Sequence, residues 1–194
     1  MDEKTYAEAV ARMEKTLSSL KTDLNKIRTG RASLALFDDI RVDYYGTPTP
    51  LNQMATLSVP EPRLITLQPW DTSVIGEIEK AILKSELGLT PASDGKMIRI
   101  NIPRLTEERR KELVKVVKKM AEGAKVAIRN IRREANDQLK GLEKNKKISQ
   151  DQLHQWMDKV QKSTDQFIEK VDGVLAAKEK EIVDTHGQAR GTLK

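Results

Sequence analysis

The sequence predicts an α+β protein in which a long antiparallel three-helix bundle carries a small inserted β/α/β domain. Apolar residues recur with helical periodicity in three long segments, near residues 3–28, 106–144 and 149–182. Residues 31–104 instead show strand-like alternation and contain all seven prolines of the chain. Three narrow apolar seams can bury one another only as a bundle. We therefore expect a discontinuous bundle from residues 1–30 and 105–185, an inserted domain at 31–104, and a flexible tail at 186–194.

The first helix is expected over residues 3–28. Its apolar residues alternate at spacings of four and three, which is a heptad pattern held for three repeats. They are Tyr6, Val10, Met13, Leu17, Leu20, Leu24 and Ile27. The pattern then stops, which argues against a long coiled-coil dimer. Thr29-Gly30 is the expected end, because glycine can take the left-handed conformation that closes a helix.

The inserted domain is predicted from alternation with period two. Ile40–Tyr44 and Ile98–Ile102 show it clearly, and the segments 54–59 and 64–68 less so. Asp94-Gly95 is a tight-turn signal ahead of the last strand. A short helix with Val74, Ile75, Ile78, Ala81 and Ile82 on its apolar face is expected to stop at Gly88. We interpret Tyr44–Pro50 as a strand end followed by a rigid turn, with a contact role as the alternative.

The second and third long helices have recognisable ends. Thr106 is a plausible N-cap for a helix reaching about residue 144, and Lys144–Lys147 is the expected turn. Ser149 and Gln152 offer a capping box for the last helix. The apolar seam of that helix is Leu153, Trp156, Val160, Phe167, Val171, Val174 and Ile182.

The net charge of +6 belongs to the C-terminal helices, because residues 105–194 hold 21 basic and 15 acidic side chains. The segment Arg109–Arg133 contains ten basic residues and only two acidic ones. The apolar face of this helix is Leu113, Val117, Met120, Ala124, Ile128, Ile131 and Ala135. Roughly opposite lie Lys111, Lys115, Lys118, Lys125, Arg129, Arg133 and Lys140, with Arg132 beside the seam. A basic helix face favours a nucleic-acid partner; a merely solvated charged face is the alternative.

Catalysis has no support in the sequence. There is no cysteine, and neither His154 nor His186 has a second ligand at metal spacing. Thr29-Gly30-Arg31 is a helix end and not a phosphate loop. No apolar run approaches a membrane span, and the first residues do not form a secretory signal. We expect a cytoplasmic binding protein without cofactor, metal or catalytic residues.

Four segments together resemble the bacterial ribosome recycling factor family. They are Lys26–Ser33, Tyr44–Leu51, Leu105–Lys111 and Arg129–Asp137, and the resemblance runs in order over residues 4–182. It implies an L-shaped monomer that binds the large ribosomal subunit and its rRNA after termination. Elongation factor G, using GTP, would then push this factor so that the ribosomal subunits separate and mRNA and deacylated tRNA are released. The resemblance does not extend to the tail from Thr185.

The resemblance also implies roles for particular residues. Arg132 is the foremost candidate for rRNA contact, with Arg129, Arg133 and Lys125 beside it; the alternative for Arg132 is an ion pair with a neighbouring helix. Arg28 and Arg31 are secondary RNA candidates, with capping and hinge packing as their alternative. The hinge between the domains would comprise Gly30, Arg31, Arg104 and Leu105.

Two other functions remain open at this point. An RNA-binding structural module would bind RNA without any dependence on elongation factor G. A protein–protein adaptor using its helical seam would form oligomers and respond little to salt, whereas phosphate contacts weaken steeply as salt rises.

Overall fold

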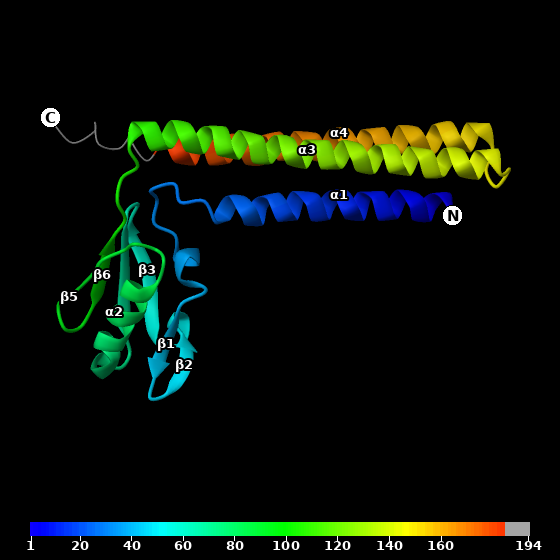
Figure 1. The fold of residues 1–194 in the computed structure, drawn as a ribbon. Coiled ribbons are helices and arrows are strands. Elements are labelled where there is room, and N and C mark those ends of the chain that lie inside the picture. Colours follow the sequence, from blue (N-terminus) through cyan, green and yellow to red (C-terminus); the bar gives the residue numbers. More distant parts are fainter. Residues whose placement is uncertain (185–194) are drawn as a thin grey trace. The chain divides into compact units, whose positions relative to one another are not determined.

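A computed structural model of the chain describes residues 1–184 (Figure 1). Two compact units are present, and each has its own core. The first joins Met1–Ile27 to Arg110–Ile182, and the second contains Arg28–Arg109. Residues 28–30 and 105–109, which were predicted to belong to the bundle, thus lie in the second unit. The reason is local: the first helix has already ended, and Gly30 packs against Leu105. The predicted tail 186–194 and His186 lie outside the described residues.

Three helices form the first unit: α1 (Asp2–Asn25), α3 (Glu107–Lys144) and α4 (Gln150–Asp184). At 1.5 Å per residue, the 38 residues of α3 span about 57 Å. Arg12 in the middle of α1 pairs with Glu134 of α3. The α1 and α3 helices run in opposite directions (Figure 1). The α1 and α4 helices run parallel, because Tyr6 bonds Ser163 at 2.8 Å and Asp2 accepts from Trp156 at 2.7 Å.

The prediction that the first helix continues to residue 28 was wrong. It ends at Asn25, and the amides of Lys26 and Ile27 bond to the carbonyls of Asp23 and Leu24 at three-residue spacing. Such bonds tighten the last turn of a helix and satisfy its free carbonyls without a glycine. Gly30 does adopt the left-handed conformation, at φ +75°, but five residues further along the chain.

The predicted helix starts are confirmed. The Thr106 hydroxyl accepts from the amide of Arg109 at 3.1 Å, as an N-cap does. Ser149 and Gln152 form the reciprocal capping box, with bonds of 2.9 and 3.1 Å. Both caps satisfy amides at helix ends that would otherwise lack a partner.

The predicted seams form the core of the bundle, with small shifts. On α3, Ala121 is buried whereas Met120 is only half-buried. On α4 three polar residues missing from the predicted seam are buried, Ser163, Thr164 and Lys178. The Lys178 ammonium pairs with Glu181 at 3.4 Å. The Thr164 hydroxyl donates to the carbonyl of Val160 at 2.7 Å, and Ser163 bonds Tyr6, so neither hydroxyl is unsatisfied.

The second unit contains a two-stranded and a four-stranded antiparallel sheet. The hairpin pairs β1 (Arg41–Tyr44) with β2 (Thr47–Pro50). The larger sheet has the order β3-β4-β6-β5. Its strands are β3 (Ala55–Glu61), β4 (Leu64–Pro69), β5 (Pro91–Ser93) and β6 (Ile98–Asn101). Short 3₁₀ turns occupy Leu34–Phe37, Leu51–Gln53 and Thr72–Val74.

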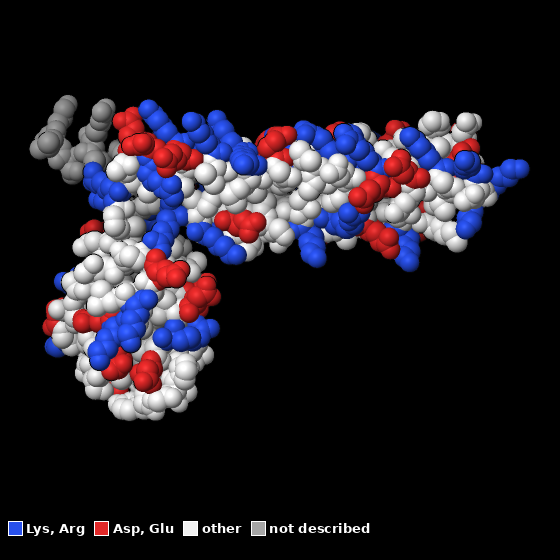
Figure 2. Space-filling model, in the orientation of Figure 1, with Lys and Arg blue, Asp and Glu red and all other residues white. Residues whose placement is uncertain are grey.

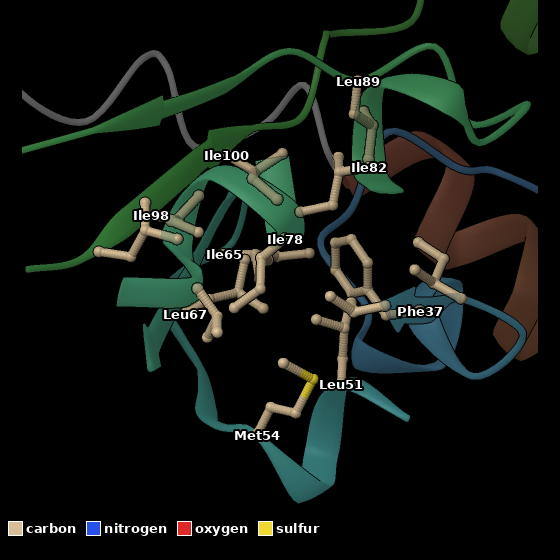
Figure 3. Close-up of a cluster of buried hydrophobic side chains, with 14 of the residues drawn as sticks. Phe37, Leu51, Met54, Ile65, Leu67, Ile78, Ile82, Leu89, Ile98 and Ile100 are labelled. Carbon is tan, nitrogen blue, oxygen red and sulfur yellow. The ribbon is translucent and has the colours of Figure 1, made fainter. Parts of the chain in front are cut away.

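The core of this unit lies between the sheets and α2 (Ile75–Lys84). Figure 3 shows its aliphatic side chains converging with Phe37. Ile78 and Ile82 of α2 and Ile98 and Ile100 of β6 are fully buried. The α2 helix ends at Lys84 and not at Gly88, because the next residue, Ser85, is already extended. The turn at Asp94-Gly95 is confirmed, with the Asp94 carboxylate accepting from the amides of Lys96 and Met97.

None of the described helices is both long enough and apolar enough to cross a membrane.

The bundle core gives a first prediction. Leu139 is fully buried on α3, so Leu139→Ala should lower the free energy of unfolding by about 2–5 kcal/mol through lost burial and a cavity. Val126, exposed on the same helix, is the matched control, and Val126→Ala should change stability by less than about 0.5 kcal/mol. Urea unfolding followed by circular dichroism measures both, and equal losses would contradict the assigned orientation of α3.

Candidate nucleic-acid interface

The burial of the α3 seam fixes which cations of this helix reach the solvent. Arg133 is exposed and Arg129 is half-buried. Figure 2 shows the basic side chains of the molecule in blue. Arg129 pairs with Glu122 of the same helix at 3.3 Å, and Arg133 bonds the Asn130 side chain at 3.4 Å. Exposed contacts of this kind contribute little to stability. Both guanidinium groups can therefore exchange them for a phosphate.

Arg132 has a different environment. It is half-buried on the side of α3 that faces α4. Its Nη1 donates to Oε1 of Gln161 on α4 at 3.5 Å, and Gln161 in turn donates to Asp165 at 2.9 Å. The alternative considered for Arg132, an ion pair with a neighbouring helix, is not formed among the described residues. The polar group nearest to this guanidinium on α4 is a neutral amide, at the outer limit of hydrogen-bond distance.

The expected position of Lys125, opposite the apolar seam, was wrong. Its side chain is only 18% exposed and pairs with Asp172 of α4. At 100° per residue Lys125 lies on the flank of α3 beside α4, where the nearest carboxylate neutralises it. Lys118 lies on the same flank and faces Glu179 at 4.0 Å. Lys125 is therefore a poorer candidate for phosphate contact than Arg129 and Arg133, whereas the Lys118 side chain stays 62% exposed.

Arg28 and Arg31 are both exposed, but only Arg28 has a described partner in the second unit. Its guanidinium donates to the carbonyls of Glu86, at 3.1 Å, and Leu87. These carbonyls lie just after the end of α2, so Arg28 ties the entering chain to that turn. This is the capping role that was the alternative to RNA binding.

The two chain crossings meet at Gly30. A side chain here would meet Cγ of Leu105 at 3.2 Å and the Leu105 amide nitrogen at 3.4 Å. Only glycine combines this closeness with φ +75° at low cost. Leu105 is half-buried and Arg104 exposed. The structure thus brings Gly30 and Leu105 into contact, whereas Arg31 and Arg104 face the solvent.

The β1–β2 hairpin has a feature that sequence reasoning did not find. Tyr45 has φ +50°, which is uncommon for a bulky residue, and 74% of its surface is exposed. Its hydroxyl lies 3.2 Å from Asp71, and Asp71 also accepts from Ser73. The bonds from Ser73, and then that from Tyr45, hold the pKa of Asp71 below its ordinary value. Gly46 was the available signal, because a type I′ hairpin turn requires positive φ at both central residues, and glycine adopts it readily.

Within residues 1–184, no cluster of three or more His, Asp or Glu side chains could hold a metal ion.

The fold and this surface define a two-unit α+β protein whose long helix presents arginines on a rigid bundle. Comparison with known proteins then identifies the family. The ribosome recycling factor family model matches residues 20–183. The ribosome-recycling factor of Syntrophobacter fumaroxidans is 63% identical over 179 residues, which are 92% of this chain and 97% of that protein. That of Syntrophus aciditrophicus is 59% identical over 184 residues, 95% of this chain and all of that protein.

Solved structures of ribosome recycling factors have the same fold as this chain. A solution structure of a ribosome recycling factor has a TM-score of 0.75 at 42% identity, covering 94% of this chain and 97% of that one. A structure of the Thermus thermophilus factor, bound with Escherichia coli elongation factor G to the E. coli post-termination complex, has a TM-score of 0.64 at 48% identity. That alignment covers 94% of this chain and 99% of the other. The chain belongs to the ribosome recycling factor family, whose members are translation factors.

The contacts of Arg28 predict a structural effect. Arg28→Ala should destabilise the second unit by about 1 kcal/mol, because two carbonyls lose a charged donor. Arg31→Ala, at an exposed neighbour, is the control and should change stability by less than about 0.5 kcal/mol. Thermal unfolding of the two variants would decide, and identical melting curves would argue against the capping role.

Proposed function

We propose that this protein, together with elongation factor G and GTP, splits the post-termination ribosome into subunits, so that mRNA and deacylated tRNA are released. The observation that carries the proposal is the similarity to ribosome-recycling factors over almost the whole length of both chains. The related Thermus thermophilus factor is bound, together with elongation factor G, to a post-termination complex. The protein acts as a monomer in the cytoplasm, where ribosomes are. It is not an enzyme, because GTP hydrolysis belongs to elongation factor G.

The bundle is the part proposed to bind the large ribosomal subunit. Arg129, Arg132 and Arg133 lie within about one turn of a long helix, so their separation is fixed. A guanidinium can donate two parallel hydrogen bonds to a phosphate and can stack on an unpaired base. Three such groups on one rigid rod select a particular arrangement of rRNA phosphates. Lys125 and Arg28 contribute less, since Asp172 and two backbone carbonyls already hold them.

The segments around Gly30, Arg31, Arg104 and Leu105 are proposed as the hinge. Two chain crossings restrict the bending of one unit against the other more than one crossing would. The bundle would stay on the ribosome while elongation factor G pushes the second unit, which contains Arg28–Arg109. The push would then reach the bundle through these residues and break contacts between the ribosomal subunits.

Light scattering of post-termination ribosomes tests the function and the RNA surface together. The wild type, with a cognate elongation factor G and GTP, should lower the scattering as subunits separate. Arg132→Ala should slow this at least about tenfold, because a charge-assisted contact is lost. Lys4→Ala is the control, since Lys4 is an exposed cation at the start of α1, and it should leave the rate unchanged.

Other results would contradict either the rRNA contact of Arg132 or the proposed function. Splitting that survives Arg132→Ala would move the rRNA contact to other residues. No splitting by the wild type would overturn the proposed function; ribosome binding that falls with salt would then favour an RNA-binding structural module, and a flat salt response with oligomers an adaptor.

The hinge has its own test. Gly30→Ala should impair splitting more than ribosome binding, because the added Cβ meets Leu105 in a strained backbone. Gly88→Ala is the matched control: φ is +66° there, but no atom lies within 4 Å of the added Cβ. Both changes cost roughly 1 kcal/mol of backbone strain. Gly30→Ala adds the close contact with Leu105, so the melting temperature and ribosome binding of each variant are measured beside the splitting rate. Equal splitting rates in the two variants would argue against a hinge at Gly30.

A further inference from the structure

Three basic residues on α3 lie seven positions apart and face α4: Lys118, Lys125 and Arg132. Residues seven apart recur on one flank of a helix in a bundle. Because α4 runs antiparallel, its facing acids also step by seven, in the opposite direction. Glu179 faces Lys118 at 4.0 Å, and Asp172 pairs with Lys125. The third acid in this series is Asp165, and it falls opposite Arg132.

The third pair does not form in the described structure, because Gln161 intervenes. Gln161 lies one turn from Asp165 on the same flank of α4, so the two side chains are neighbours. Its Nε2 donates to Oδ1 of Asp165 at 2.9 Å, and its Oε1 accepts from Nη1 of Arg132 at 3.5 Å.

The orientation of the Gln161 amide follows from Asp165. An ionised carboxylate can only accept hydrogen bonds, so it binds the NH₂ end of the amide. The carbonyl end is then directed towards Arg132, which can only donate. Asp165 thus fixes Gln161, and Gln161 in turn restrains a long side chain that would otherwise sample many rotamers.

As a result, no carboxylate of the described residues neutralises the guanidinium of Arg132, whereas Asp172 neutralises Lys125. A carboxylate in direct contact would neutralise the guanidinium and compete with a phosphate for its donors. The neutral amide uses one of five N–H donors and leaves the positive charge in place. Affinity for a nucleic-acid backbone depends on such uncompensated charges.

We infer that Gln161 is a positioning residue for Arg132: it holds the guanidinium in place and keeps Asp165 from pairing with it, so that Arg132 can bind an rRNA phosphate. This inference rests on the proposed function. It assigns a role in ribosome binding to two exposed residues of α4, neither of which needs to touch RNA.

The experiment measures the affinity of the full-length protein for purified bacterial large ribosomal subunits at several KCl concentrations. Gln161→Ala removes the intervening amide, so Asp165 should pair with Arg132 as Asp172 does with Lys125. Affinity should then fall by about tenfold, and the slope of log affinity against log salt should decrease by about 0.7–0.9, as for one lost phosphate contact. Adding Asp165→Asn to this variant removes the competing charge, so the salt slope should return to that of the wild type and most of the affinity should be restored. The part of the affinity that depends on the restraint of Arg132 by Gln161 stays lost.

Two further variants test whether Gln161 acts through Arg132 and Asp165, and not through the overall charge of α4. Glu169→Gln removes the same charge one turn from Asp165, on an exposed part of α4, and should not rescue Gln161→Ala. In an Arg132→Ala background, Gln161→Ala should have no further effect, because it acts through Arg132. Melting temperatures of all variants verify that the bundle is folded.

The results that would overturn the inference are specific. Wild-type affinity in Gln161→Ala, or a loss that Asp165→Asn fails to rescue, would exclude the proposed role of Gln161. Either result leaves the proposed function intact if the wild type still splits ribosomes with elongation factor G and GTP. A wild type that neither binds nor splits ribosomes would overturn both.

Discussion

The structure depends on the burial of one narrow apolar seam of α3 between α1 and α4. This seam includes Val117, Ile128 and Leu139, all fully buried, and it leaves α3 one favourable rotation about its axis. The rotation sets the environment of every cation on the helix. Arg129 and Arg133 face outwards, whereas Lys125 lies against Asp172. The basic residues of α3 point to the solvent on one side of the helix because its opposite side is apolar and buried.

The same packing determines which cations form ion pairs within the bundle and which can bind a phosphate. Cations on the α4 flank lie opposite carboxylates at heptad spacing. Asp172 neutralises the largely buried Lys125, whereas Lys118 stays exposed at 4.0 Å from Glu179. Arg132 is on this flank too, but it contacts an amide. Its position between the seam and the outer face gives it packing for its stem and a free charge at its tip.

The second unit is built on a different principle, because its core is supplied by residues close in sequence. Ile78, Ile98 and Ile100 pack together within one continuous segment of the chain. The close contact of Gly30 with Leu105 joins the two crossings at the ends of this segment and needs a residue without Cβ. The unit therefore has a core of its own, supplied without residues from the three long helices.

Periodicity and chemistry by themselves determined much of this protein. The three long helices, their caps at Thr106 and Ser149, and most buried positions follow from local spacing, since helix geometry converts sequence distance into a face. Strands β2 and β5 were missed because they are short and proline-containing, and their pairing depends on partners distant in sequence. Only the tertiary structure decided which cations are free, since an ion pair such as Lys125–Asp172 joins residues far apart in the chain. It also decided that Arg28 caps the turn after α2 and that Gly30 packs against Leu105, because both contacts exist only once distant segments have met.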